Sequence, residues 1–222
     1  MKLEDSAALA VMGGSLTVRG PVDVGSNAVL GNVNNTAPIE IDGPASVGSH
    51  AALIIGVESP GQPIVSAIRG PVRAHDASTV QIHNTRIGGP VSLVGGGGEN
   101  AILNALAGPG ANFNDLEDNQ ILGSVGETGY DGIWAGIIRN RIYGPMTFAE
   151  NTEPPLPPGS PFVNEYDIGS NRIYGPAKCD ENNPAPNMGP SSGSPSIVYG
   201  PTRGDQAATC TGTAAGQTGP PV

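Results

Sequence analysis

Apolar residues alternate with polar or small ones in short runs along most of the chain, on either side of a recurring glycine. Eight such units align, and the residue two places before the glycine is always valine or isoleucine: Val18, Ile41, Ile68, Ile87, Ile121, Ile142, Ile173 and Val198. Period-two alternation is typical of strands that bury one face. The pattern therefore predicts short β-strands joined at glycine bends, most of which continue into proline.

Two further columns of mostly apolar residues follow each bend. The second of them reads Val24, Val47, Ala74, Leu93, Glu127, Phe148, Cys179 and Gly204. Between bends, another apolar stretch recurs at 28–30, 51–55, 80–82, 101–103 and 133–138. Glycine interrupts these stretches too often for helical spacing, so each predicts a strand and none a helix.

The columns predict a right-handed parallel β-helix of about eight coils, because stacked coils align residues of one type into a continuous core. The bends recur at intervals of 19 to 34 residues, which a solenoid tolerates as insertions. Asn119, Asn140 and Asn171 each stand two residues before a column isoleucine and predict an asparagine ladder at a corner. A β-sandwich with glycine-proline turns is the alternative.

We expect a single domain over residues 1–210, with an N-terminal cap at 1–14, a C-terminal cap at 176–210 and a flexible tail at 211–222. Cys179 falls in an inward column and Cys210 lies just beyond the last unit. A disulfide between them would clip the tail across the open end of the solenoid and contribute roughly 3–4 kcal/mol. Two buried thiols are the alternative.

Charge is sparse and negative, with a formal net charge of −10 and a pI near 4.5. The chain lacks the basic footprint of a nucleic-acid binder. No apolar run approaches the roughly 20 residues of a membrane span. A net negative surface also predicts repulsion of anionic polysaccharides. Residues 1–7 are acidic and lack a long apolar region, so we expect no signal peptide there. The composition favours an exported chain whose leader has been removed, and a cytoplasmic protein is the alternative.

One segment carries a family resemblance. Residues 175–186 (GPAKCDENNPAP), followed by Cys210, resemble a Cys-x-x-Asn-x-Pro-x-Pro signature of secreted actinobacterial proteins that also carry repeated Asn-x-Ile/Val-x-Gly units. Asn183 is an extra residue in the cysteine-to-proline interval. The resemblance covers about 36 residues and implies an exported or surface-associated β-helix. That family has no assigned activity, so no catalytic residue transfers.

Carboxylates gather in the segment 113–131, which we take as an insertion from the solenoid: Asp115, Glu117, Asp118, Glu127 and Asp131. Polysaccharide hydrolases use such groups as acid and base, and calcium takes the same oxygens. No adjacent aspartate pair or calcium-loop motif accompanies them, so a solvated loop is the favoured interpretation. Zinc motifs are absent too, and we predict no catalytic residue, metal or cofactor.

An aromatic stripe is the more specific candidate. In register, Tyr143, Tyr174 and Tyr199 would stack on one outward face, beside a parallel stack of Arg141 and Arg172, while Trp134 lies on the presumed insertion. Such a stripe either stabilises the solenoid or binds sugar rings. We therefore expect a non-catalytic extracellular or cell-surface module, structural or adhesive, with a polysaccharide or cell-wall glycan as candidate partner. The alternative is a β-helix that acts on polysaccharides, as a lyase or hydrolase does, or that binds carbohydrate.

Overall fold

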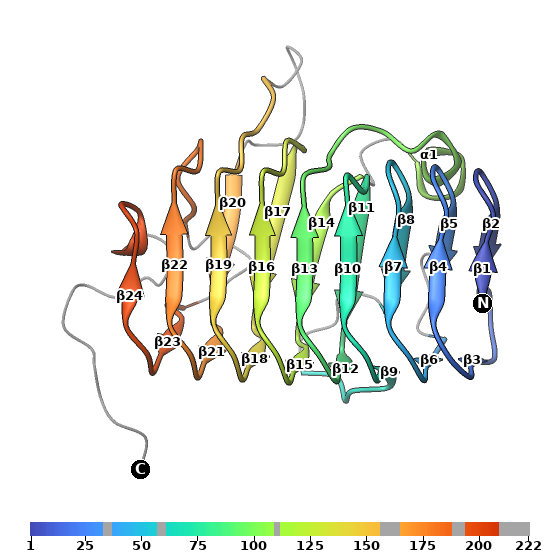
Figure 1. Cartoon of the computed structure of the whole chain (residues 1–222), viewed down its shortest axis with the longest axis horizontal. Coiled ribbons are helices and arrows are strands. Elements are labelled where there is room, and N and C mark those ends of the chain that lie inside the picture. The colour runs from blue at the N-terminus through green and yellow to red at the C-terminus, as the bar shows by residue number, and fades with distance from the viewer. Residues whose placement is uncertain (33–36, 57–60, 109–111, 156–164, 188–193, 209–222) are drawn as a thin grey trace.

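The computed structural model describes residues 1–32, 37–56, 61–108, 112–155, 165–187 and 194–208. Nearly all regular structure in these residues is β-strand, and the strands pair in parallel throughout. The strands form three sheets, here called A, B and C, which the chain visits in turn (Figure 1). This arrangement fits the predicted parallel β-helix and excludes a sandwich of antiparallel sheets.

Within the described residues sheet A contains nine strands, and all of them except β1 follow a glycine bend. They are β1 (Lys2–Leu3), β4 (Val22–Val24), β7 (Ala45–Val47), β10 (Val72–His75), β13 (Val91–Val94), β16 (Val125–Thr128), β19 (Met146–Ala149), β22 (Ala177–Asp180) and β24 (Thr202–Arg203).

Sheet B contains seven strands in the part of the chain that the structure describes. They are β2 (Ala8–Ala10), β5 (Val29–Gly31), β8 (Ala52–Ile55), β11 (Thr79–His83), β14 (Asn114–Glu117), β17 (Trp134–Ile138) and β20 (Glu165–Gly169).

Sheet C precedes the bends, and its eight strands among the described residues match the eight units of the sequence. They are β3 (Leu16–Val18), β6 (Ile39–Ile41), β9 (Ser66–Ile68), β12 (Thr85–Ile87), β15 (Gln120–Ile121), β18 (Arg141–Ile142), β21 (Arg172–Ile173) and β23 (Ile197–Val198). All eight column residues of valine or isoleucine are buried, as predicted.

One continuous core extends from Leu3 in β1 to Val198 in β23. The predicted asparagine ladder is present at the corner between sheets B and C. Asn140 accepts a hydrogen bond from the Asn119 backbone N–H at 3.0 Å, and Asn171 accepts one from the Asn140 N–H at 2.9 Å. Each side-chain amide also donates to a backbone carbonyl, so the ladder satisfies buried polar groups on both sides.

The prediction of a strand at 101–103 is wrong. These residues begin helix α1 (Ala101–Ala107), whose N-cap Asn100 accepts a hydrogen bond from the Leu103 N–H at 2.8 Å. Leu103 packs against Val29, Ala52 and Ile54 on the outer side of sheet B. Tertiary burial therefore stabilises a helix too short to be stable alone.

The interval from Gly89 to Gly123 owes its length to α1, and not to residues 113–131. Those residues supply β14, β15 and β16, which are regular strands of the coils. Residues 1–14 contribute β1 and β2, the end strands of sheets A and B. Residues 176–210 contribute β22, β23 and β24, while Cys210 and the predicted tail at 211–222 lie outside the described residues.

Candidate functional site

The outer side of sheet C presents two columns of exposed or half-buried side chains, which we call the sheet C face. Because column isoleucines point inward, the residues before and after them point outward. The first column contains Thr17, Glu40, Ala67, Arg86, Gln120, Arg141, Arg172 and Ile197. The second contains Arg19, Asp42, Arg69, Gly88, Leu122, Tyr143, Tyr174 and Tyr199.

The three tyrosines of the second column form the stack that the sequence predicts. The ring centroids of Tyr143 and Tyr174 lie 5.0 Å apart, and those of Tyr174 and Tyr199 lie 4.9 Å apart. Both pairs are near parallel, with interplanar angles of 11°. The facing sides of neighbouring rings therefore cover each other. What the stack offers a ligand along its length is the ring edges and the hydroxyl groups.

Arg141 joins the two columns. Its Cζ lies 5.9 Å from the ring centroids of both Tyr143 and Tyr174, and its Nε donates to the Tyr174 hydroxyl at 3.3 Å. Arg172 is its register partner on the next coil, and both side chains are exposed. The two guanidinium groups are thus presented on adjacent coils beside the tyrosine edges.

Positive charge is concentrated on this face. Five of the eight arginines of the chain belong to its two columns: Arg19, Arg69, Arg86, Arg141 and Arg172. The same columns contain only two carboxylates, Glu40 and Asp42, and Asp42 is paired with Arg69 at 2.8 Å. The predicted repulsion of anionic polysaccharides follows from net charge alone, which does not reveal how charges are distributed over the faces of the molecule.

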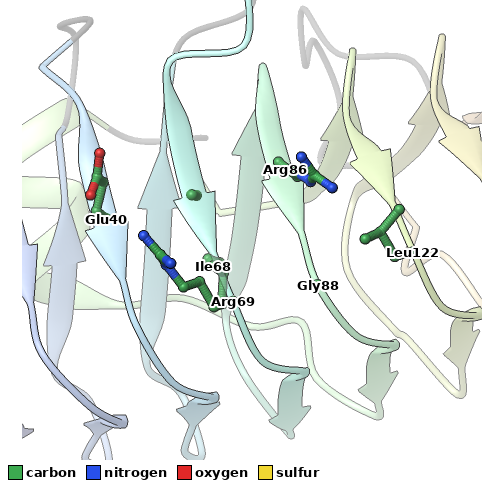
Figure 2. A pocket seen from close by; sticks show the side chains of 7 residues that line it. Glu40, Ile68, Arg69, Arg86, Gly88 and Leu122 are labelled. Atoms are coloured by element: carbon green, nitrogen blue, oxygen red, sulfur yellow. The ribbon is translucent and has the colours of Figure 1, made fainter.

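A pocket of about 520 Å³ lies at the middle of the same face (Figure 2). It forms where small residues interrupt both columns, and its lining is Glu40, Ala67, Ile68, Arg69, Arg86, Gly88 and Leu122. In Figure 2, Arg69 turns toward the strand of Glu40 and Arg86 toward that of Leu122. The pocket thus combines an apolar floor with charged walls, which suits a polar ligand with a flat apolar side.

Leu122 connects the pocket to the tyrosine stack. It precedes Tyr143 in the second column and is 41% exposed, so the pocket, Leu122 and the stack follow one another along the solenoid axis. Sequence reasoning missed the contribution of Glu40, Arg69 and Arg86. The repeat places these three residues in the same two columns as Arg141 and the tyrosines, so the alignment could have identified them. A column of identical aromatic residues is easier to recognise than one of charged residues of alternating sign.

Trp134 does not belong to this face. It begins β17 in sheet B, where its ring packs edge-to-face on Phe113 with centroids 5.4 Å apart. A Cβ at Gly136 would collide with the Trp134 ring, so the indole lies over this glycine. Trp134 and the tyrosine stack are thus two separate features, on different sheets.

The carboxylates of the segment 113–131 also separate in space. Glu127 points into the core, Asp131 is exposed, and Asp115 and Glu117 are buried on the outer side of sheet B. The solvated-loop interpretation is therefore wrong for Asp115, Glu117 and Glu127. His83 lies against Asp115 and Glu117, and burial lowers the pKa of its imidazole to about 4.

Within the described residues, no helix has the length and apolarity that crossing a bilayer takes. Comparisons of the chain with protein-family models, curated proteins and solved structures gave no match.

Proposed function

We propose that the protein is a non-catalytic, exported β-helix module that adheres to an acidic glycan through the sheet C face. The observation that supports the proposal is that five of the eight arginines lie on the face that also contains the tyrosine stack, in a chain of net charge −10. A positive patch with aromatic edges has no role in packing the core, which lies on the other side of these strands.

A linear glycan suits this face because both are periodic. Successive coils present equivalent side chains about 4.8 Å apart, a step comparable to one sugar ring in an extended chain. Arg141 and Arg172 would pair with carboxylate or sulfate groups through charge-assisted hydrogen bonds. The tyrosine hydroxyls would contact sugar hydroxyls, and the pocket at Gly88 would take one ring against Leu122.

We also propose that the protein is exported from the cell. Export is supported by the resemblance of residues 175–186 to secreted actinobacterial proteins and by the position of Cys179, which is 1% exposed in β22. We propose a right-handed solenoid closed by a Cys179–Cys210 disulfide, with Cys210 outside the described residues. Thiol titration of the unreduced, denatured chain should find no reactive thiol, and two after reduction.

A polysaccharide panel tests the adhesive function. Protein depletion onto insoluble glycans and release of soluble product are measured together, with acidic and neutral polymers compared. We expect depletion onto acidic polymers without product. Product release would instead support the carbohydrate-active alternative, and no depletion across the panel would leave a purely structural module.

Matched charge variants localise the binding surface. Arg141→Gln/Arg172→Gln removes two positive charges from the sheet C face, and Arg73→Gln/Arg203→Gln removes two exposed ones from sheet A. We expect the first pair to weaken binding at least tenfold and the second to change it little. Equal losses in the two double variants would contradict a site on sheet C.

A further inference from the structure

A second cluster of polar side chains lies on the outer side of sheet B, in strands β11 and β14. Val80, Ile82 and Leu116 of these strands belong to the core, so the alternate residues point outward. His83 and Glu117 are register partners on neighbouring coils, and Asp115 lies two residues before Glu117 on the same side. The coil register thus joins residues that are 32 to 34 positions apart in the chain.

Their donor atoms converge. His83 Nε2 lies 3.6 Å from Asp115 Oδ2, and His83 Nδ1 lies 4.0 Å from Glu117 Oε2. One ligand atom from each of the three residues lies within 4.8 Å of the other two. Atoms that share a tetrahedral ion at bonds of about 2.0–2.2 Å are themselves about 3.3–3.6 Å apart. A small inward movement would therefore give a metal-binding geometry.

Hydrogen bonding within the described residues leaves the Nδ1 atom of the His83 imidazole unsatisfied. Separations of 3.6 and 4.0 Å are longer than hydrogen bonds. The side chain is only 4% exposed, and among the described residues its Nδ1 has no hydrogen-bond partner. Buried polar atoms are normally satisfied. The imidazole lies between two carboxylates, with Nε2 toward Asp115 and Nδ1 toward Glu117, and a bound cation would satisfy one of its nitrogens.

Arg139 supplies the support that metal-binding carboxylates commonly have. Its Nη2 contacts Glu117 Oε2 at 2.6 Å and Asp118 Oδ2 at 3.0 Å, which fixes the Glu117 carboxylate. In their ionised forms, Asp115, Glu117 and Asp118 carry three negative charges against the one positive charge of Arg139. The excess of two negative charges matches a divalent cation.

We propose that His83, Asp115 and Glu117 bind one divalent first-row transition-metal ion, of which zinc fits best. One imidazole and two carboxylates are common zinc donors, whereas calcium takes six to eight oxygens and does not favour imidazole. The ion would join β11 to β14 across the interval in which the chain leaves the coils to form α1 (Figure 1). This proposed metal site lies on sheet B, so it does not depend on the proposed glycan binding by the sheet C face.

Metal titration of the untagged, chelator-dialysed chain tests the proposal. Isothermal titration with zinc chloride should give one ion per chain. At a hundredfold excess over Kd, the Tm should rise by roughly 5–10 °C. His83→Ala and Asp115→Asn should each weaken binding at least tenfold. The His50→Ala/His75→Ala double variant keeps His83 and should bind like the parent.

This control is needed because exposed His75 could bind zinc as well, since its Nδ1 lies 2.9 Å from Asp76 Oδ2. Circular dichroism checks the fold of each variant. If His83→Ala does not fold, zinc binding by Asp115→Asn decides the test. Cobalt substitution should give the visible bands of a nitrogen and oxygen site, without a thiolate band. The proposal is overturned if zinc does not bind saturably, if binding disappears with His50 and His75, or if calcium binds and zinc does not.

Discussion

Asn114 Nδ2 donates a 3.0 Å hydrogen bond to Glu127 Oε1 inside the solenoid core. Glu127 occupies an inward position of sheet A, in register with Leu93 on one side and Phe148 on the other. Its second carboxylate oxygen has no hydrogen-bond partner among the described residues. Burial dominates and raises the pKa of Glu127 to about 7, although the Asn114 hydrogen bond opposes the shift.

The raised pKa predicts a pH-dependent stability. Between pH 4.5 and 7, Glu127 keeps its proton in the folded chain and loses it in the unfolded chain. The unfolded state then binds fewer protons, so stability falls as pH rises through this window and levels off above it. At about 1.4 kcal/mol for each unit of pKa shift, Glu127 lowers the unfolding free energy at pH 8 by up to about 3 kcal/mol.

Glu127→Gln should remove this loss, because the amide keeps the shape and stays neutral. Urea denaturation at several pH values should show a variant more stable than the parent at pH 8 by about 1–3 kcal/mol, with no difference at pH 4. Glu150→Gln is the matched control, since Glu150 is exposed. A parallel pH profile for parent and Glu127→Gln would mean that Glu127 is not the responsible group.

Glycines of the bends are required by stacking. A Cβ at Gly175 would lie 2.6 Å from the backbone carbon of Gly144 and from the backbone nitrogen of Pro145, both on the previous coil. Gly175→Ala must therefore separate two coils, and we expect a loss of about 2 kcal/mol or more. A Cβ added at Gly126 in β16 would meet nothing within 4 Å, so Gly126→Ala should cost less than about 0.5 kcal/mol.

Thermal and urea unfolding of the two alanine variants measure this contrast directly. Equal effects at Gly175 and Gly126 would show that the bend glycines serve only chain flexibility.

Asn140 is expected to be the most sensitive position of the asparagine ladder. Its Oδ1 accepts from the Asn119 N–H, and its Nδ2 donates to the Leu116 carbonyl at 2.6 Å. Asn140→Ala leaves two buried backbone groups unsatisfied, at about 1–3 kcal/mol each. Urea denaturation should give a combined loss of about 2–6 kcal/mol, whereas Gln120→Ala on the outward side should cost far less. Similar losses in the two variants would contradict a structural role for the ladder.

The coils could be predicted from the sequence because each coil has the same packing and hydrogen-bonding requirements at the same positions. Ile142 and Ile173 must be buried, Gly144 and Gly175 must lie close together, and Asn140 and Asn171 must bond to adjacent coils. These requirements recur in the same order and create visible columns. The tyrosine stack follows from the same register, so it could be predicted as well.

Features that break the repeat could not be predicted in this way. Helix α1 is stabilised by Leu103 packing on sheet B, a contact that local spacing does not reveal. Placing 113–131 outside the solenoid concealed β14, and with it the pairing of His83 with Glu117. Register in a solenoid is known only when each insertion has been located.

Tyr174→Phe separates the two roles of the tyrosine stack. The ring remains between Tyr143 and Tyr199, so stacking and stability should be kept, within about 0.5 kcal/mol. The hydroxyl that accepts from Arg141 Nε is lost, which frees the guanidinium and removes one polar group from the sheet C face. If the face binds a glycan, depletion onto an acidic polymer should weaken several-fold although the Tm is unchanged.

Tyr174→Ala should lower both the glycan binding and the Tm. It removes the ring on which Tyr143 and Tyr199 stack, at centroid distances of 5.0 and 4.9 Å. A Tyr174→Phe variant with parental binding and a destabilised Tyr174→Ala variant would instead identify the stack as a stabilising ladder alone.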